Sequence, residues 1–391
     1  MAIEPAFREG PFNPGLDTPD FGSSGSMPSF VADVVAAPTP RVAPDDLRGI
    51  LREHALLIGL VAAYWVAALA VSSYYKLPDD LLSNLAGYAA PMIMPLVFAL
   101  CWHAISIMVF IRPKHLTRYV IASLKENLTR ERVSFALPVV LLVPVFATAF
   151  TFLKNAIPVI RPYTWDARLS AWDALVHGGT PPWMLLQPYL GHPLVTGAIN
   201  VLYNLWFFVI YAILILQAFA LRDRRLRMQF LLSFVLIWIL LGTVGAIAFS
   251  SMGPCYYPNF AQASGPYAPL MAYLRGAAEH VPVWALNVQQ MLWDDYQNNK
   301  AGIGSGISAM PSMHVATSVL LALFGWRFSR RAGIALTLYA LVIMIGSVHL
   351  GWHYALDGYA GALGAAVVWW LVGRLLVREP RHPIGAPGGP R

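Results

Sequence analysis

The stretch GSVHLGWHYALDGYAG, residues 346–361, holds three ionisable side chains in an otherwise apolar run. They are His349, His353 and Asp357, spaced four residues apart. On a continuous helix this spacing predicts that the three side chains share one face. A carboxylate one turn from a histidine can accept a hydrogen bond from one ring nitrogen and leave the lone pair of the other nitrogen free. The arrangement of the stretch is therefore suited to a nucleophilic histidine.

The composition around this stretch indicates an integral membrane protein. Hydrophobic residues make up 57% and charged residues 12% of the 391-residue chain, which is unlike an ordinary soluble protein. Apolar runs of the length that crosses a bilayer recur along the sequence and predict an all-α fold with about eight spans. The expected spans are residues 55–75, 90–111, 134–153, 195–221, 229–250, 315–330, 332–350 and 356–377.

The same pattern divides the chain into four parts. Residues 1–45 are rich in Pro, Gly and Ser and predict a disordered cytoplasmic tail. Residues 46–133 contain two spans and a basic cytoplasmic loop, and residues 378–391 form a second cytoplasmic tail. Residues 134–377 hold the remaining six spans, which we expect to form the catalytic bundle.

The distribution of Lys and Arg predicts how the spans are oriented. The second, fourth and sixth loops carry six, four and three of these residues, whereas the first, fifth and seventh carry one, two and none. The third loop carries three, Lys154 and Arg161 among them. Basic residues concentrate in cytoplasmic loops, so we expect both termini to be cytoplasmic. The basic residues form no single patch, and no nucleic-acid partner is expected.

Two further polar segments lie on the same predicted side of the membrane as His353 and Asp357. One is Lys154–Pro162, which contains Arg161, and the other is Ala309–His314 at the end of the long fifth loop. This orientation places the candidate site on the non-cytoplasmic face of a multi-pass protein, which we expect in a bacterial cytoplasmic membrane.

The chemistry of the three segments is complementary. Two cations and the backbone amides near Gly302, Gly304 and Gly306 suit a phosphate group. One histidine can attack phosphorus, and a second can protonate the leaving oxygen. The sequence has no carboxylate cluster of the kind that holds magnesium, so we expect neither a metal ion nor another cofactor.

These residues resemble the three motifs of the type 2 phosphatidic acid phosphatase superfamily. The motifs are Lys154-(six residues)-Arg161-Pro162, Pro311-Ser312-Met313-His314 and His353-Tyr-Ala-Leu-Asp357. Met313 stands where the family usually has Gly, and Gly346-Ser347 stand where it has Ser-Arg. The motifs PSMH and HYALD, with WDARLSAWDALVHGG at residues 165–179, resemble the branch that includes inositol phosphorylceramide synthases. The resemblance covers about residues 150–375.

The resemblance implies a mechanism through a phosphohistidine. His353 would be the nucleophile, Asp357 would orient it, and His314 would protonate the leaving group and then activate the acceptor. The resemblance also implies a set of residues that hold the phosphoryl oxygens: Lys154, Arg161 and Ser312, with His349 partly replacing the missing arginine. The substrate would be a lipid phosphate and the acceptor either water or an alcohol.

Several alternatives remain open at this stage. The protein could be a lipid phosphatase or a headgroup phosphotransferase, and a long fifth loop that covers the site would favour transfer. Two alternatives involve no catalysis: the protein could be a catalytically inactive lipid-binding relative, or it could be a multi-span transporter. Asp166 and Asp173 are expected to be solvated or capping residues within an aromatic interfacial segment, residues 163–190. The fourth and fifth spans carry little polar character apart from Asn200 and Asn204.

Overall fold

The computed structural model describes residues 47–78, 87, 93, 97, 100–101, 103–260, 265–298, 300 and 304–377. Within these ranges every regular element is a helix. The two predicted tails and part of the predicted span 90–111 lie outside the described residues.

Six described helices are long and apolar enough to cross a membrane. They are α3 (Ala55–Tyr75), α6 (Arg130–Ile160), α9 (Pro193–Ala218), α10 with its continuation (Arg224–Ala248), α16 (Arg330–His349) and α17 (Ala355–Val377). A seventh apolar helix, α15 (Met313–Phe328), has only 16 residues. The expected count of about eight spans is therefore not confirmed, although six of the eight predicted runs coincide with these long helices.

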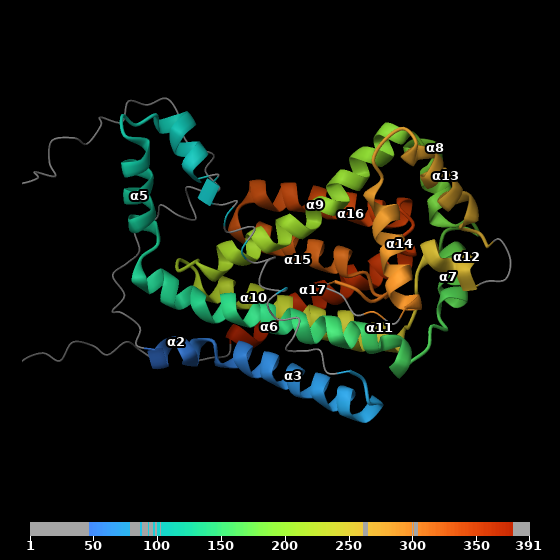
Figure 1. Ribbon diagram of the computed structural model, residues 1–391, viewed down its shortest axis with the longest axis horizontal. Helices are drawn as coiled ribbons and strands as arrows, with labels where there is room; N and C mark the ends of the chain where they lie inside the picture. Colours follow the sequence, from blue (N-terminus) through green and yellow to red (C-terminus); the bar gives the residue numbers. More distant parts are fainter. Residues whose placement is uncertain are drawn as a thin grey trace, which may run out of the picture.

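Helix α15 lies at the centre of the bundle, in contact with α9, α10, α16 and α17 (Figure 1). Its apolar residues are spread around the helix, which is typical of a helix enclosed by others, and Val315, Leu320 and Leu321 are fully buried. Glycines of α17 allow close packing here: a Cβ on Gly361 would come within 2.5 Å of the Ser312 carbonyl oxygen. The glycines thus bring α17 against the start of α15.

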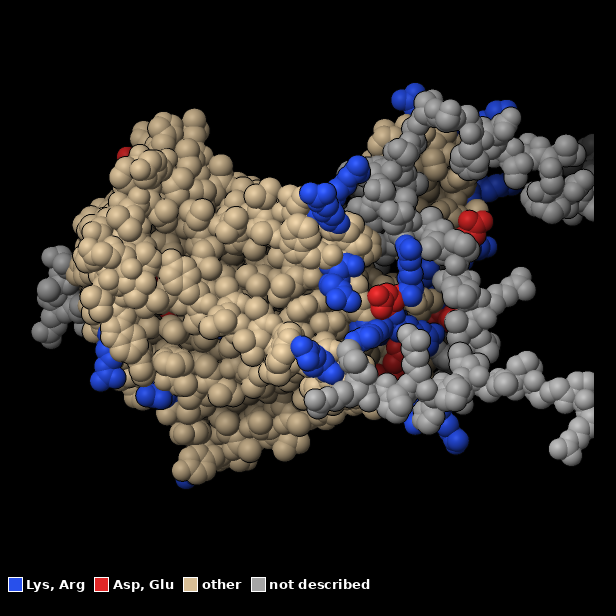
Figure 2. All heavy atoms as spheres, turned by 180° about the vertical axis from the view of Figure 1, so that it is seen from behind, with Lys and Arg blue, Asp and Glu red and all other residues tan. Residues whose placement is uncertain are grey.

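The two ends of the bundle differ in charge. Most Lys and Arg gather at the end that carries the short helices α2 (Leu47–Glu53) and α5 (Leu116–Asn127) (Figures 1 and 2). The opposite end is covered by four short helices, α7 (Asp166–Val176), α8 (Pro182–Leu190), α13 (Ala268–Ala278) and α14 (Trp284–Gln297) (Figure 1). A one-sided distribution of this kind is what the positive-inside pattern predicts.

Candidate active site

The chain turns between His349 and His353, so these two side chains do not share the helix face that their spacing suggested. Helix α16 ends at His349, Gly351 has φ +74°, and α17 begins only at Ala355. Glycine adopts this left-handed conformation at little cost and commonly ends helices. The turn rotates His353 away from the helix face that carries His349.

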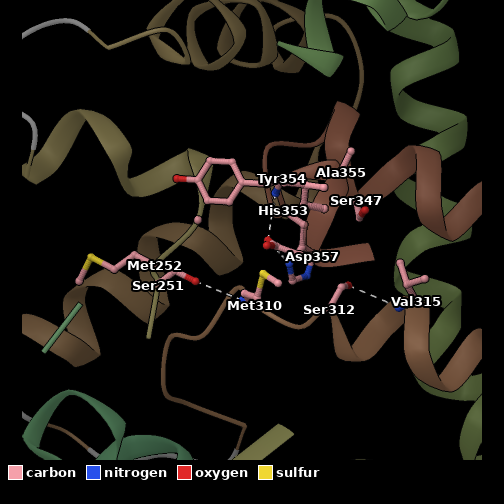
Figure 3. Close-up of polar contacts among 12 residues, drawn as sticks. Ser251, Met252, Met310, Ser312, Val315, Ser347, His353, Tyr354, Ala355 and Asp357 are labelled. Atoms are coloured by element: carbon pink, nitrogen blue, oxygen red, sulfur yellow. Dashed lines mark hydrogen bonds and ion pairs between the residues drawn. The ribbon is translucent and has the colours of Figure 1, made fainter. Parts of the chain in front are cut away.

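His353 and Asp357 form a buried pair at the start of α17. His353 Nδ1 lies 3.4 Å from Asp357 Oδ2, with the two side chains 7% and 0% exposed. This distance is longer than a good hydrogen bond and lies within the range of an ion pair. The Tyr354 backbone N–H donates to the same Oδ2 at 3.0 Å (Figure 3). Asp357 is therefore fixed as a helix-capping carboxylate, and its position near Nδ1 favours the tautomer with a free lone pair on His353 Nε2.

His314 is held opposite His353 by the start of α15. Ser312 caps this helix by accepting a hydrogen bond from the Val315 N–H at 3.4 Å (Figure 3). Its own N–H donates to the Asp357 carbonyl oxygen at 2.9 Å. These contacts join the first turns of α15 and α17, and the two imidazole ring centres lie 6.3 Å apart. A phosphoryl group between the rings would have one nitrogen on each side.

Two aromatic side chains of α9 hold the His314 ring. Its ring centre lies 4.7 Å from that of Tyr203 and 4.1 Å from that of Trp206. Trp206 is itself fixed by a hydrogen bond from its Nε1–H to Thr317 Oγ1 at 2.9 Å. The sequence analysis missed both residues, because aromatic side chains in an apolar span are ordinarily lipid-facing or core residues. The three-residue spacing of Asn200, Tyr203 and Trp206, which places them on one helix face, could have indicated that this face is turned toward a polar site.

Lys154 and the predicted glycine segment meet on the other side of the site. Gly306 has φ +89°, and a Cβ on it would come within 3.1 Å of Lys154 Cγ. The Asn155 side chain next to Lys154 donates to Ser305 Oγ at 2.8 Å. A glycine is needed at position 306 both for its backbone conformation and for this close approach.

Three predicted phosphate-binding residues are not brought to this point. Arg161 is exposed just past the end of α6, and Ser312 is buried as the cap of α15. His349 is also buried, and its Nε2 lies 2.9 Å from Thr196 Oγ1. The predicted role of His349 as a replacement for arginine is not supported, because the turn at Gly351 directs it elsewhere.

His314, His353 and Lys154 line one cavity of about 450 Å³, a volume typical of ligand sites. Most of its remaining wall is apolar and comes from α6, α9 and α10. Apolar side chains that line it include Phe146, Phe150, Phe207, Ile210, Leu214 and Phe234. The cavity thus joins a small polar region to a much larger apolar one inside the bundle.

The fifth loop contributes to the wall of the same cavity. Met252, Tyr256, Val288 and Leu292 line it together with the segment 304–308. Among the described residues, no group of three or more His, Cys, Asp or Glu side chains could hold a metal ion. The ionisable side chains that line the cavity include Lys154, His314 and His353.

Asp166 and Asp173 of α7 are buried, with exposures of 2% and 1%, so the expectation that they are solvated is wrong. Burial raises the pKa of both carboxyls, and backbone N–H donors partly oppose that shift. The capping interpretation holds for Asp173, which accepts hydrogen bonds from the N–H groups of Ala355 and Leu356.

A comparison with protein families adds to this geometry. A family model described as PAP2 superfamily matches residues 167–371. The matched range includes His314, His353 and Asp357, and it begins after Lys154 and Arg161. No curated protein and no solved structure matches the chain.

Proposed function

The chain belongs to the PAP2 superfamily, and from this premise we propose that it transfers the phosphoryl group of a lipid phosphate through a phosphohistidine. Membership supports a lipid-phosphatase-like activity in general, and the six long apolar helices indicate a multi-pass membrane protein. Beyond this general activity, we propose which residues carry the reaction, that a phosphohistidine is the intermediate, and which kind of molecule accepts the phosphoryl group.

The cavity is the observation that carries the proposal. Its polar end holds His314, His353 and Lys154, and its apolar wall is formed by helices long enough to cross the bilayer. An amphiphile with a phosphate at one end and a hydrocarbon chain at the other matches both regions. A soluble phosphate ester would leave the apolar part of the cavity unused.

Each proposed step uses a group already in position. His353 Nε2 attacks phosphorus, the bond from phosphorus to the leaving oxygen breaks, and His314 donates a proton to that oxygen. In the second half-reaction His314 takes a proton from the acceptor, whose oxygen attacks the phosphohistidine and releases His353. Asp357 stabilises the imidazolium form of His353, and Lys154 offsets negative charge on the phosphoryl oxygens.

We propose that the site faces the non-cytoplasmic side of a bacterial cytoplasmic membrane. Support comes from the gathering of Lys and Arg at the end of the bundle that carries α2 and α5 (Figure 2). The loop segments that line the cavity, among them 304–308, belong to the sparsely charged fifth loop. Positive charge is typical of the cytoplasmic end.

The acceptor is proposed to be an alcohol, as in the inositol phosphorylceramide synthases that the sequence resembles. The fifth loop supports this proposal, because Met252, Tyr256, Val288 and Leu292 line the cavity. An apolar cover limits the access of water to the phosphohistidine and favours a bound alcohol. Hydrolysis is the second candidate, since the same two histidines would serve water equally well.

The test is incubation of purified protein with radiolabelled lipid phosphates, with and without candidate alcohols such as inositol or ceramide. We expect labelled product that contains the alcohol. Release of inorganic phosphate alone under every condition would contradict transfer and leave the lipid phosphatase. No turnover at all would contradict both and leave an inactive lipid-binding relative.

The apolar cavity predicts a selective effect of the substitution Ala147→Phe. Ala147 lines the cavity on α6, so a phenyl ring there fills space that we assign to the hydrocarbon chain. We expect kcat/KM for long-chain lipid phosphates to fall at least about tenfold, with little change for short-chain analogues. Leu141→Phe is the control, because Leu141 lies on the same helix and is 59% exposed. Equal losses for both chain lengths would contradict the assignment.

A further inference from the structure

Helix α7 carries two buried carboxylates on one face. Asp166 and Asp173 are seven residues apart, which is two helical turns. Neither is a member of the His353–Asp357 pair, yet both make hydrogen bonds to the segments that carry the site. Each follows a tryptophan, in the repeated dipeptides Trp165-Asp166 and Trp172-Asp173.

Asp173 binds the first backbone amides of α17. Its Oδ2 accepts from the Ala355 N–H and its Oδ1 from the Leu356 N–H, both at 3.1 Å. Together with the bond from Tyr354 N–H to Asp357, three successive amides directly after His353 are held by two carboxylates. A helix N-terminus capped in this way has little freedom to rotate or fray.

Asp166 binds the residue next to the nucleophile and the segment that faces it. The Tyr354 hydroxyl donates to Asp166 Oδ1 at 3.0 Å, and the Gly253 N–H donates to the same atom at 2.8 Å. Gly253 packs directly on the nucleophile loop, since a Cβ there would come within 2.6 Å of the Trp352 carbonyl oxygen. The carboxylate thus fixes both sides of the turn that precedes α17.

The segment next to Gly253 continues to the loop of His314. The Ala309 N–H donates to the Ser251 carbonyl oxygen at 3.0 Å, and the Met310 N–H donates to Ser251 Oγ at 3.2 Å (Figure 3). Residues 309–312 lead directly into α15 and His314. Through this chain of contacts, α7 connects the loop of one histidine to the loop of the other.

We propose that Asp166 and Asp173 are positioning residues that set the separation and orientation of His353 and His314. They touch no reacting atom, and they act through the backbone amides of residues 252–253 and 355–356 and the hydroxyl of Tyr354. Because the histidine ring centres lie 6.3 Å apart, a shift of about 1 Å would disturb in-line transfer and cost about 100-fold in rate. The inference rests on the proposed phosphoryl transfer.

The test compares Asp173→Asn and Asp173→Ala with Asp223→Asn in purified protein acting on a labelled long-chain lipid phosphate. Asp223 is a matched control, because its carboxylate caps α10 by accepting from the Leu226 N–H at 2.8 Å. We expect kcat to fall about 100-fold for Asp173→Ala and less for Asp173→Asn, which keeps one acceptor oxygen. KM should stay within about twofold in both, and Asp223→Asn should keep its kcat, because Asn caps a helix about as well as Asp does.

Tyr354→Phe provides a second variant that removes only the hydroxyl bound to Asp166, so it tests the positioning role even where an aspartate variant fails to fold. Its kcat should fall at unchanged KM. Equal kcat values for Tyr354→Phe, Asp173→Asn and Asp223→Asn, in an active wild-type background, would overturn the positioning role alone. A wild-type protein without turnover would overturn the proposed function and this inference together.

Discussion

Replacing His353 by alanine is expected to lower phosphate release or transfer by at least about 10⁴-fold, because removal of a covalent nucleophile can cost about 10⁶-fold in rate. The physical reason is that the variant retains the cavity and Lys154 but has no atom to bond to phosphorus. The rate is measured with purified protein and labelled lipid phosphate, and folding is checked by thermal unfolding.

His349→Gln is the matched control for this variant. His349 is also a buried histidine of the same segment, but its ring contacts Thr196 and Tyr273 and does not line the cavity. We expect it to lose stability and to keep kcat within a few-fold of the wild type. A large loss for His349→Gln with little loss for His353→Ala would reverse the assignment of the nucleophile.

Replacing His314 by alanine is expected to lower the rate by about 10³-fold, within the range for general acid–base catalysis. The loss should depend on the leaving group, because a phenolate with a low pKa departs without protonation. With an activated aryl phosphate ester, phosphoenzyme formation should therefore fall only about tenfold in His314→Ala.

The dependence of the rate on the leaving group distinguishes the role of His314 from that of His353. His353→Ala should be equally inactive toward activated and ordinary esters, since the nucleophile is needed for both. The double variant should be scarcely slower than His353→Ala, because the two residues act as one unit. A loss in His314→Ala that is the same for all esters would contradict its role as general acid.

Much of the bundle was predictable because bilayer-spanning helices have a simple requirement of length and apolar composition. The ends of the predicted spans lie within a few residues of α3, α9 and α16. Helix α6 extends beyond the predicted span 134–153 at both ends, and Pro158 lies in the extension without ending the helix. In a membrane bundle, neighbouring helices satisfy the groups that proline leaves free.

The proximity of the three motifs was predictable, because the predicted orientation of the spans places them on the same side of the membrane. The structure brings His353, Asp357, His314 and Lys154 together, and each belongs to a motif recognised in the sequence. The expected face shared by His349 and His353 failed because a single residue, Gly351 with φ +74°, ends one helix and starts a turn. Sequence spacing has meaning only while the helix continues.

The residues that sequence reasoning missed act through long-range contacts. Tyr203 and Trp206 hold the ring of a histidine more than 100 residues away in the sequence, and Asp166 accepts from Tyr354 across 188 residues. No pattern of neighbouring residues in the sequence predicts these long-range contacts. The spacing of polar and aromatic residues on α9 and the repeated Trp-Asp of α7 were the only available signals.

The central claim is that the phosphoryl group passes through a covalent bond to His353, and trapping that intermediate tests it most directly. Purified wild-type protein is mixed with a ³²P-labelled lipid phosphate, quenched in base and digested for peptide mapping. We expect a phosphoenzyme that survives base, is lost in acid, and maps to the peptide with His353. His353→Ala should give none, while His314→Ala should still form it with an activated ester. Efficient turnover by the wild type with no trapped label, or label on another residue, would contradict the account.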